Sequence, residues 1–193
     1  MQRISVFCGS STGNRQSYSE AARALGLALC KRDIELVYGG GGVGLMGVIA
    51  DAVLAAGGRV IGVIPEDLVA KEVGHKGLTD LRVVRSMHER KAMMAALSDA
   101  FIALPGGYGT FEEFCEVITW GQLGLHRKPC GVLNVDGYYS PLLSFFDQAV
   151  VEGFVFGPHR RMVIEQSDPD LLLDLLSSYQ APATIKWVDR KNV

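Results

Sequence analysis

The stretch of this chain with the clearest chemical potential is residues 105–113, Pro-Gly-Gly-Tyr-Gly-Thr-Phe-Glu-Glu. An apolar run before it predicts a buried strand, and the residues after it have helical spacing, so the stretch is a strand-to-helix turn. Glycine lets a ligand approach the backbone closely, and a helix start offers unpaired N–H groups and the positive end of the helix dipole. Because these properties suit an anion, the turn predicts a phosphate or nucleotide site.

The same residues also have a purely structural interpretation. Thr110 is a candidate N-cap of the following helix, and Glu113, three residues later, would complete a capping box. A cap needs only one flexible residue, whereas three glycines precede Thr110. That excess of glycine favours a ligand over a turn alone.

Carboxylate and basic side chains accompany the turn: Glu72, Arg90, Lys91, Glu112 and Glu113. Breaking a ribosyl C–N bond builds positive charge on the sugar, and a carboxylate stabilises that charge or activates a water. Carboxylates beside a phosphate site therefore favour N-glycosidic cleavage of a nucleotide. Arg90 has a simpler alternative as a solvated charge, because it lies in a charged run at a helix start.

Two segments resemble the signatures of one family, the Lonely Guy (LOG) family of cytokinin riboside 5′-monophosphate phosphoribohydrolases. Residues 105–113 resemble its PGGxGTxxE motif, and residues 87–91, Met-His-Glu-Arg-Lys, resemble its second motif. The resemblance extends from residues 6–10 through the glycines at 39–41 to about Gly124. It implies hydrolysis of N6-substituted adenosine 5′-monophosphates, and often AMP, to free base and ribose 5-phosphate, with no metal or organic cofactor.

The same resemblance implies particular roles for residues of this chain. It places the catalytic pair at Arg90 and Glu113. It also implies a homodimer, for which Trp120, Leu123 and Leu125 are candidate interface residues because they are apolar and near the end of the motif helix. The implied substrate contacts are Glu72, Lys91, Gly106, Gly107, Tyr108, Gly109, Thr110, Phe111, Glu112 and Thr119.

Three other functions deserve comparison. Gly39, Gly41 and Gly44 match a dinucleotide fingerprint, with Glu66 downstream for a ribose, which would suit an NAD(P)-dependent oxidoreductase. The match follows the second predicted strand, however, and the chain is short for an added substrate domain. A carrier would hold a nucleotide without cleaving it. Lysine decarboxylation, a label many LOG proteins once carried, would need a pyridoxal phosphate lysine, and only Lys91 lies near the motifs.

The elements that must position these residues alternate between strands and helices. Strands are predicted at residues 4–7, 35–38, 59–64, 81–84, 100–104, 130–133 and 162–165. Helices are predicted at residues 18–31, 45–56, 90–97, 110–123, 141–152 and 168–176, while residues 66–80 are irregular or weakly helical. This alternation predicts a single α/β domain over residues 1–193, a Rossmann-like doubly wound parallel sheet with helices on both faces. Such sheets bind ligands at the carboxyl ends of their strands, where the glycine turns fall.

Composition narrows the possible partners. The 193 residues are 48% hydrophobic and 21% charged, which indicates a globular domain, and the net charge of −2 argues against nucleic-acid binding. No apolar run approaches the ~20 residues of a membrane span. The four scattered cysteines favour reduced thiols in a cytoplasmic protein over disulfides or a metal site.

Overall fold

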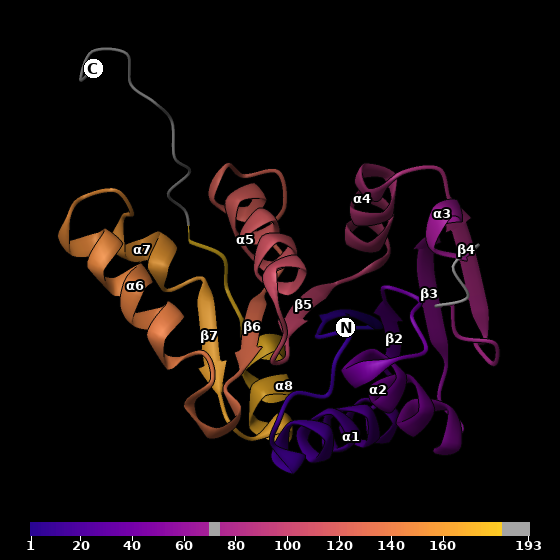
Figure 1. Cartoon of the computed structure of the whole chain (residues 1–193). Helices are drawn as coiled ribbons and strands as arrows, with labels where there is room; N and C mark the ends of the chain where they lie inside the picture. Colours follow the sequence, from indigo (N-terminus) through magenta and orange to yellow (C-terminus); the bar gives the residue numbers. More distant parts are fainter. Residues whose placement is uncertain (70–73, 183–193) are drawn as a thin grey trace.

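The computed structural model describes residues 1–69 and 74–182 and places seven strands in one parallel sheet. The strand order is β4-β3-β2-β1-β5-β6-β7 (Figure 1). Every neighbouring pair is parallel, so all strands end at the same edge. The strands are β1 (Arg3–Phe7), β2 (Glu35–Tyr38), β3 (Val60–Pro65), β4 (Asp80–Val84), β5 (Ala100–Ala103), β6 (Cys130–Leu133) and β7 (Val163–Gln166).

Helices cover both faces of this sheet (Figure 1). One face packs against α1 (Gln16–Lys31), α2 (Gly44–Ala55) and α8 (Pro169–Ser178). The other packs against α4 (Met87–Leu97), α5 (Tyr108–Gln122) and α6 (Ser140–Val151). The apolar side chains between these layers are almost fully buried, which confirms the predicted doubly wound, Rossmann-like architecture.

The chain reverses direction across the sheet after β4. It starts at β1 in the middle, moves outward to β4 at one edge, and returns through α4 to β5 on the other side of β1. The turns after β1 and β5 therefore diverge to opposite faces. A crevice at such a switch point is where open α/β sheets bind ligands.

The predicted elements agree with the structure to within about three residues at each end. Two differences matter for the site. Helix α5 begins at Tyr108 with Gly107 as its N-cap, two residues before the predicted start. Helix α4 begins at Met87, where Ser86 caps it by accepting a hydrogen bond from the Glu89 N–H.

Short elements complete the fold. The stretch predicted as irregular contains α3 (Glu66–Val69) and an isolated antiparallel bridge between Gly41 and Gly74. The 3₁₀ turn η1 (Val135–Gly137) and α7 (Gly157–Arg160) were not predicted.

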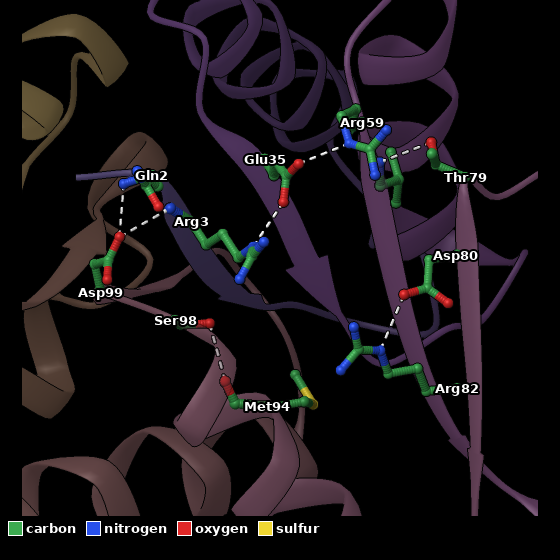
Figure 2. Close-up of polar contacts among 11 residues, drawn as sticks. Gln2, Arg3, Glu35, Arg59, Thr79, Asp80, Arg82, Met94, Ser98 and Asp99 are labelled. Atoms are coloured by element: carbon green, nitrogen blue, oxygen red, sulfur yellow. Dashed lines mark hydrogen bonds and ion pairs between the residues drawn. The ribbon is translucent and has the colours of Figure 1, made fainter.

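The amino ends of the central strands are joined by charged side chains (Figure 2). Glu35 at the start of β2 accepts hydrogen bonds from Arg3 Nε at 2.6 Å and Arg59 Nε at 2.7 Å, which connects β1, β2 and the residue before β3. Asp99 accepts from the backbone N–H groups of Gln2 and Arg3. Hydrogen bonding to Arg3 is the main cause that lowers the pKa of Glu35, which keeps this carboxylate ionised in mild acid. This edge is thus closed by ion pairs, whereas the carboxyl edge is built from glycine turns.

Candidate active site

Three glycine-containing turns meet at the carboxyl edge of the sheet, after β1, β2 and β5. The Gly9 N–H donates to the Pro105 carbonyl at 3.0 Å, and the Leu45 N–H donates to the Gly9 carbonyl at 3.0 Å. A Cβ at Gly44, where φ is +60°, would lie 2.2 Å from the Ser10 carbonyl carbon, so only glycine fits this approach. Beside these turns lies an open cavity of about 450 Å³.

The turn after β5 presents the start of α5 to this cavity. The first hydrogen bond of the helix runs from the Phe111 N–H to the Gly107 carbonyl at 3.1 Å. The N–H groups of Tyr108, Gly109 and Thr110 therefore make no hydrogen bond to any described residue. The predicted anion-binding geometry, a helix start with unpaired donors, is present.

The predicted capping box is absent, because the helix starts earlier than the pattern suggested. Thr110 is the third residue of α5 and is buried, and the Gly107 cap receives no side-chain hydrogen bond. Thr110 instead fills the space beside Gly106, where a Cβ would lie 2.1 Å from the Thr110 hydroxyl. Glu113, two turns into the helix, takes no part in capping, so its carboxylate is available for another role.

Glu113 and Arg90 both line the cavity, and their side chains lie beside each other. The Arg90 Nη2 and Glu113 Oε1 atoms are 3.6 Å apart, and both side chains are about one-tenth exposed, at 11% and 10%. Burial is the main cause that raises the pKa of Glu113, and the Arg90 charge only partly offsets it. At 3.6 Å the two groups attract each other without a tight hydrogen bond, so each keeps capacity for a ligand.

Arg90 is held inward by the sheet, so the alternative of a solvated charge is wrong. Its Nε donates to the Val63 carbonyl at 3.2 Å. The space for its guanidinium exists because residue 39 is glycine, since a Cβ at Gly39 would lie 1.8 Å from Arg90 Nη2. Gly39 thus makes room for the Arg90 side chain, although the spacing of the glycines at positions 39, 41 and 44 had suggested a dinucleotide-binding site.

Lys91 lies between two carboxylates of α5. Its Nζ is 2.5 Å from Glu112 Oε1 and 3.1 Å from the Glu116 carboxylate. The hydrogen bond to Glu112 is the main cause that raises the pKa of Lys91. Both glutamates of this i, i+4 pair are therefore satisfied by one ammonium group, which removes the repulsion expected between them.

The other predicted contact residues are divided between the cavity and its surroundings. Tyr108 borders the cavity and is 92% exposed, while Phe111 packs behind the turn against Tyr138 and Tyr139. Thr119 does not line the cavity, and its hydroxyl donates to the Cys115 carbonyl at 2.8 Å. Glu72 lies outside the described residues. The predicted residues that line the cavity are Arg90, Gly107, Tyr108, Gly109, Thr110, Glu112 and Glu113.

Several lining residues were not among the predicted contacts. The turn after β1 contributes Cys8, Gly9 and Ser10, and burial strongly raises the pKa of the Cys8 thiol. Their position at the end of the first predicted strand was the available signal. An apolar wall comes from helix and strand ends and comprises Val43, Met46, Ile64, Leu68 and Met87. Met87 lies in the second motif, but no motif marks the other four, because ordinary core residues have the same types.

Comparison with known proteins decides the family. A family model described as "Possible lysine decarboxylase" matches residues 46–176. A probable cytokinin riboside 5′-monophosphate phosphoribohydrolase of Oryza sativa subsp. japonica is 56% identical over 178 residues, covering 92% of this chain and 78% of the relative. The chain belongs to the Lonely Guy family. A second LOG relative, a cytokinin riboside 5′-monophosphate phosphoribohydrolase of Arabidopsis thaliana, is 53% identical and covers 92% of this chain and 84% of its own length.

Solved structures share the fold of this LOG protein. The molybdenum cofactor binding protein of Rippkaea orientalis superposes with a TM-score of 0.70 at 23% identity, covering 92% of this chain and 96% of the other. The molybdenum cofactor carrier protein of Chlamydomonas reinhardtii superposes with a TM-score of 0.69 at 19% identity, covering 92% and 99%. At these identities the likeness establishes architecture alone.

Two kinds of feature are absent from the described residues. None of their helices combines the length and the apolar character that a membrane span requires. Nor do their His, Cys, Asp and Glu side chains form a cluster of three or more that could hold a metal ion.

Two glycines of the turn should respond differently to a change to alanine, Gly109 through ligand binding and Gly106 through stability. Gly109 has no positive φ, and a Cβ there meets nothing within 4 Å. If the turn holds a phosphate, Gly109→Ala should weaken binding of inorganic phosphate severalfold while unfolding stability stays equal or rises by ~0.4–1 kcal/mol. Gly106→Ala, which would clash with Thr110 and Gly9, should instead lower the melting temperature. Calorimetry and thermal unfolding measure both, and unchanged phosphate binding in Gly109→Ala would refute the cradle.

Proposed function

We propose that this LOG protein hydrolyses the N-glycosidic bond of N6-substituted adenosine 5′-monophosphates, AMP, or both, releasing the free base and ribose 5-phosphate. The observation that carries the proposal is the buried Arg90–Glu113 pair beside a helix start with unpaired N–H groups. The names of relatives 53–56% identical support the same reaction. Among the described residues that line the cavity, Glu113 is the more buried of the two carboxylates, since the side chain of Glu112 is 54% exposed.

Glu113 suits the charge that develops on the sugar. As the bond from the ribose C1′ to the base weakens, positive charge spreads over the ring carbon and oxygen. The Glu113 carboxylate would stabilise this charge or take a proton from the attacking water, whose oxygen forms the new bond to C1′. Arg90 would keep Glu113 oriented and oppose the effect of burial on its pKa, so that enough carboxylate is present at neutral pH.

The unpaired donors of α5 suit the 5′-phosphate. A charge-assisted hydrogen bond contributes ~1.5–3 kcal/mol, and the dipole of the helix adds to the attraction. With the phosphate held at the turn, the ribose would extend toward Arg90 and Glu113, and the base toward the apolar wall. We expect Lys91 and Glu112 to contribute through their ion pair at the rim. Glu72, Phe111 and Thr119 remain predictions from family resemblance.

The alternative functions find less support in the geometry. An oxidoreductase would need the start of α2 for a pyrophosphate, but the Leu45 N–H there already donates to the Gly9 carbonyl and the turn after β1 packs against Gly44. A lysine decarboxylase would need a neutral lysine for a Schiff base, whereas Lys91 is held as a cation by two glutamates. A carrier would not need the Arg90–Glu113 pair, and incubation with AMP distinguishes it by the absence of released adenine.

We further propose that residues 1–193 form one domain and that the protein is a cytoplasmic homodimer. The end of α5 and the turn after it expose Leu123 and Leu125, at 48% and 71%, whereas Trp120 packs largely into the core. Dimerisation would cover these apolar side chains. Multi-angle light scattering at micromolar concentration should give the mass of a dimer, and a monomer at every concentration tested would contradict this assignment.

Removal of the Glu113 charge tests its chemical role. Glu113→Gln keeps the shape of the side chain, and turnover should fall ~10²-fold or more with little change in folding. Because burial raises the pKa of Glu113, wild-type activity should be lost as pH falls through a value above the ordinary glutamate range. Glu116→Gln, a change on the same helix outside the cavity, is the matched control and should lower turnover less than about threefold. Near-normal turnover of Glu113→Gln would leave this residue without a catalytic role.

A comparison of AMP with adenosine tests the substrate class. Loss of the phosphate removes its attraction and leaves the N–H groups of α5 unpaired, and two such bonds are worth roughly a hundredfold in kcat/KM. Adenine release measured by chromatography at equal, subsaturating concentrations should therefore be far faster from AMP. Rates within about threefold of each other would indicate a nucleosidase that recognises only base and ribose. Release from neither compound, with cytokinin nucleotides also inert, would refute hydrolysis.

A further inference from the structure

Two consecutive tyrosines, Tyr138 and Tyr139, bind backbone carbonyls of the glycine turn through their hydroxyl groups. The Tyr138 hydroxyl donates a short hydrogen bond to the Gly106 carbonyl, and the Tyr139 hydroxyl donates to the Leu104 carbonyl at 2.6 Å. Both tyrosines follow β6, which lies next to β5 in the sheet (Figure 1), so they come from the neighbouring strand and not from the segment they contact. Neither belongs to the motifs that resemble the family signatures.

With these bonds, four successive carbonyls around the turn are held in place. The Leu104 carbonyl accepts from Tyr139, that of Pro105 from the Gly9 N–H, that of Gly106 from Tyr138, and that of Gly107 from the Phe111 N–H. A trans peptide points its N–H opposite to its C=O. A held carbonyl therefore fixes the direction of the N–H group of the next residue.

Only one of the two tyrosine bonds can direct a donor in this way. The Gly106 carbonyl is followed by the Gly107 N–H, which makes no hydrogen bond to a described residue and belongs to a residue that lines the cavity. The Leu104 carbonyl is followed by Pro105, which has no N–H. Tyr138 thus acts on a peptide with a free donor, whereas Tyr139 acts on one without.

The position of Tyr138 is itself fixed by its neighbours. Its ring meets Tyr18 edge-on at a centroid distance of 5.6 Å and stacks near Phe111 at 6.5 Å. The preceding turn contains Asp136 with φ of +51°, whose carboxylate accepts a hydrogen bond from the Ser17 hydroxyl at 2.6 Å. Aspartate adopts this left-handed conformation more readily than most residues, so Asp136 suits the tight turn that leads into Tyr138.

We propose that Tyr138 is a positioning residue of the phosphate cradle, whose hydroxyl turns the Gly106–Gly107 peptide so that the Gly107 N–H points at the bound phosphate. This inference rests on the proposed function in assigning the phosphate to the turn. The Gly107 N–H, which comes just before α5, would then bind the phosphate together with the unpaired N–H groups at the start of the helix. The peptide with glycine on both sides has no side chain to resist rotation, so without Tyr138 it turns more freely.

The matched pair Tyr138→Phe and Tyr139→Phe tests this assignment. Each change removes one hydroxyl that binds a carbonyl beside the turn, and both are expected to lower the melting temperature. Only Tyr138→Phe should weaken the affinity for ribose 5-phosphate, by about tenfold, because only it releases a phosphate donor. Inhibition by adenine should stay unchanged in both variants, since neither tyrosine directs a group toward the base. The measurements are inhibition constants for ribose 5-phosphate and adenine against AMP hydrolysis.

The outcomes separate this inference from the proposed function. If wild-type protein releases no base from AMP, the proposed hydrolysis fails, and the dissociation constant of AMP by calorimetry then compares the same variants. Ribose 5-phosphate or AMP affinities that change alike in the two variants, or by less than about twofold in Tyr138→Phe, overturn the role of Tyr138. Should Tyr138→Phe unfold at the assay temperature, the same inhibition constants are measured at a lower temperature, with the same expectations.

Discussion

The close backbone contact between the turns after β1 and β5 is the constraint on which the rest of the site depends. The Gly9 N–H and the Pro105 carbonyl meet at 3.0 Å, and no Cβ fits at Gly106 on this side. The contact brings together two strands whose following helices lie on opposite faces of the sheet, since α1 follows β1 and α5 follows β5. Because this junction is made of backbone atoms, the donors at the start of α5 lie at a fixed distance from the sheet.

The Arg90–Glu113 pair depends on that junction. Glu113 is positioned by the start of α5, and Arg90 by the start of α4 together with the Val63 carbonyl of β3. Burial of two opposite charges has a desolvation cost that a contact at 3.6 Å repays only in part. The pair is therefore weak evidence for stability. Its raised carboxylate pKa is the kind of perturbation that functional sites often contain.

Much of this arrangement could be predicted from sequence, for identifiable reasons. The strands of a parallel sheet are short apolar runs that end in glycine turns, so their order along the chain and the edge that carries the site followed from pattern alone. The prediction of a capping box was wrong although Thr110 and Glu113 have the right spacing. Helix α5 begins two residues before its predicted start, so Thr110 lies inside the helix and not at its cap. The inward position of Arg90 could not be derived from a charged run, because the space that admits it is made by Gly39, about fifty residues earlier. The contribution of Tyr138 lay beyond pattern analysis, since a hydroxyl bound to a backbone carbonyl leaves no spacing signal.

The glycine at position 39 also bears on how related sequences should be interpreted. A relative with the residue 105–113 motif, Arg90 and Glu113 all intact would look fully equipped by its chemistry-bearing residues. Any side chain at position 39 would nevertheless occupy the volume of the guanidinium, with its Cβ only 1.8 Å from where Nη2 lies. Such a protein would retain the helix start, but its Arg90 guanidinium would have to move from the place it occupies beside Glu113. An achiral residue with no functional group thus determines where the buried cation can lie.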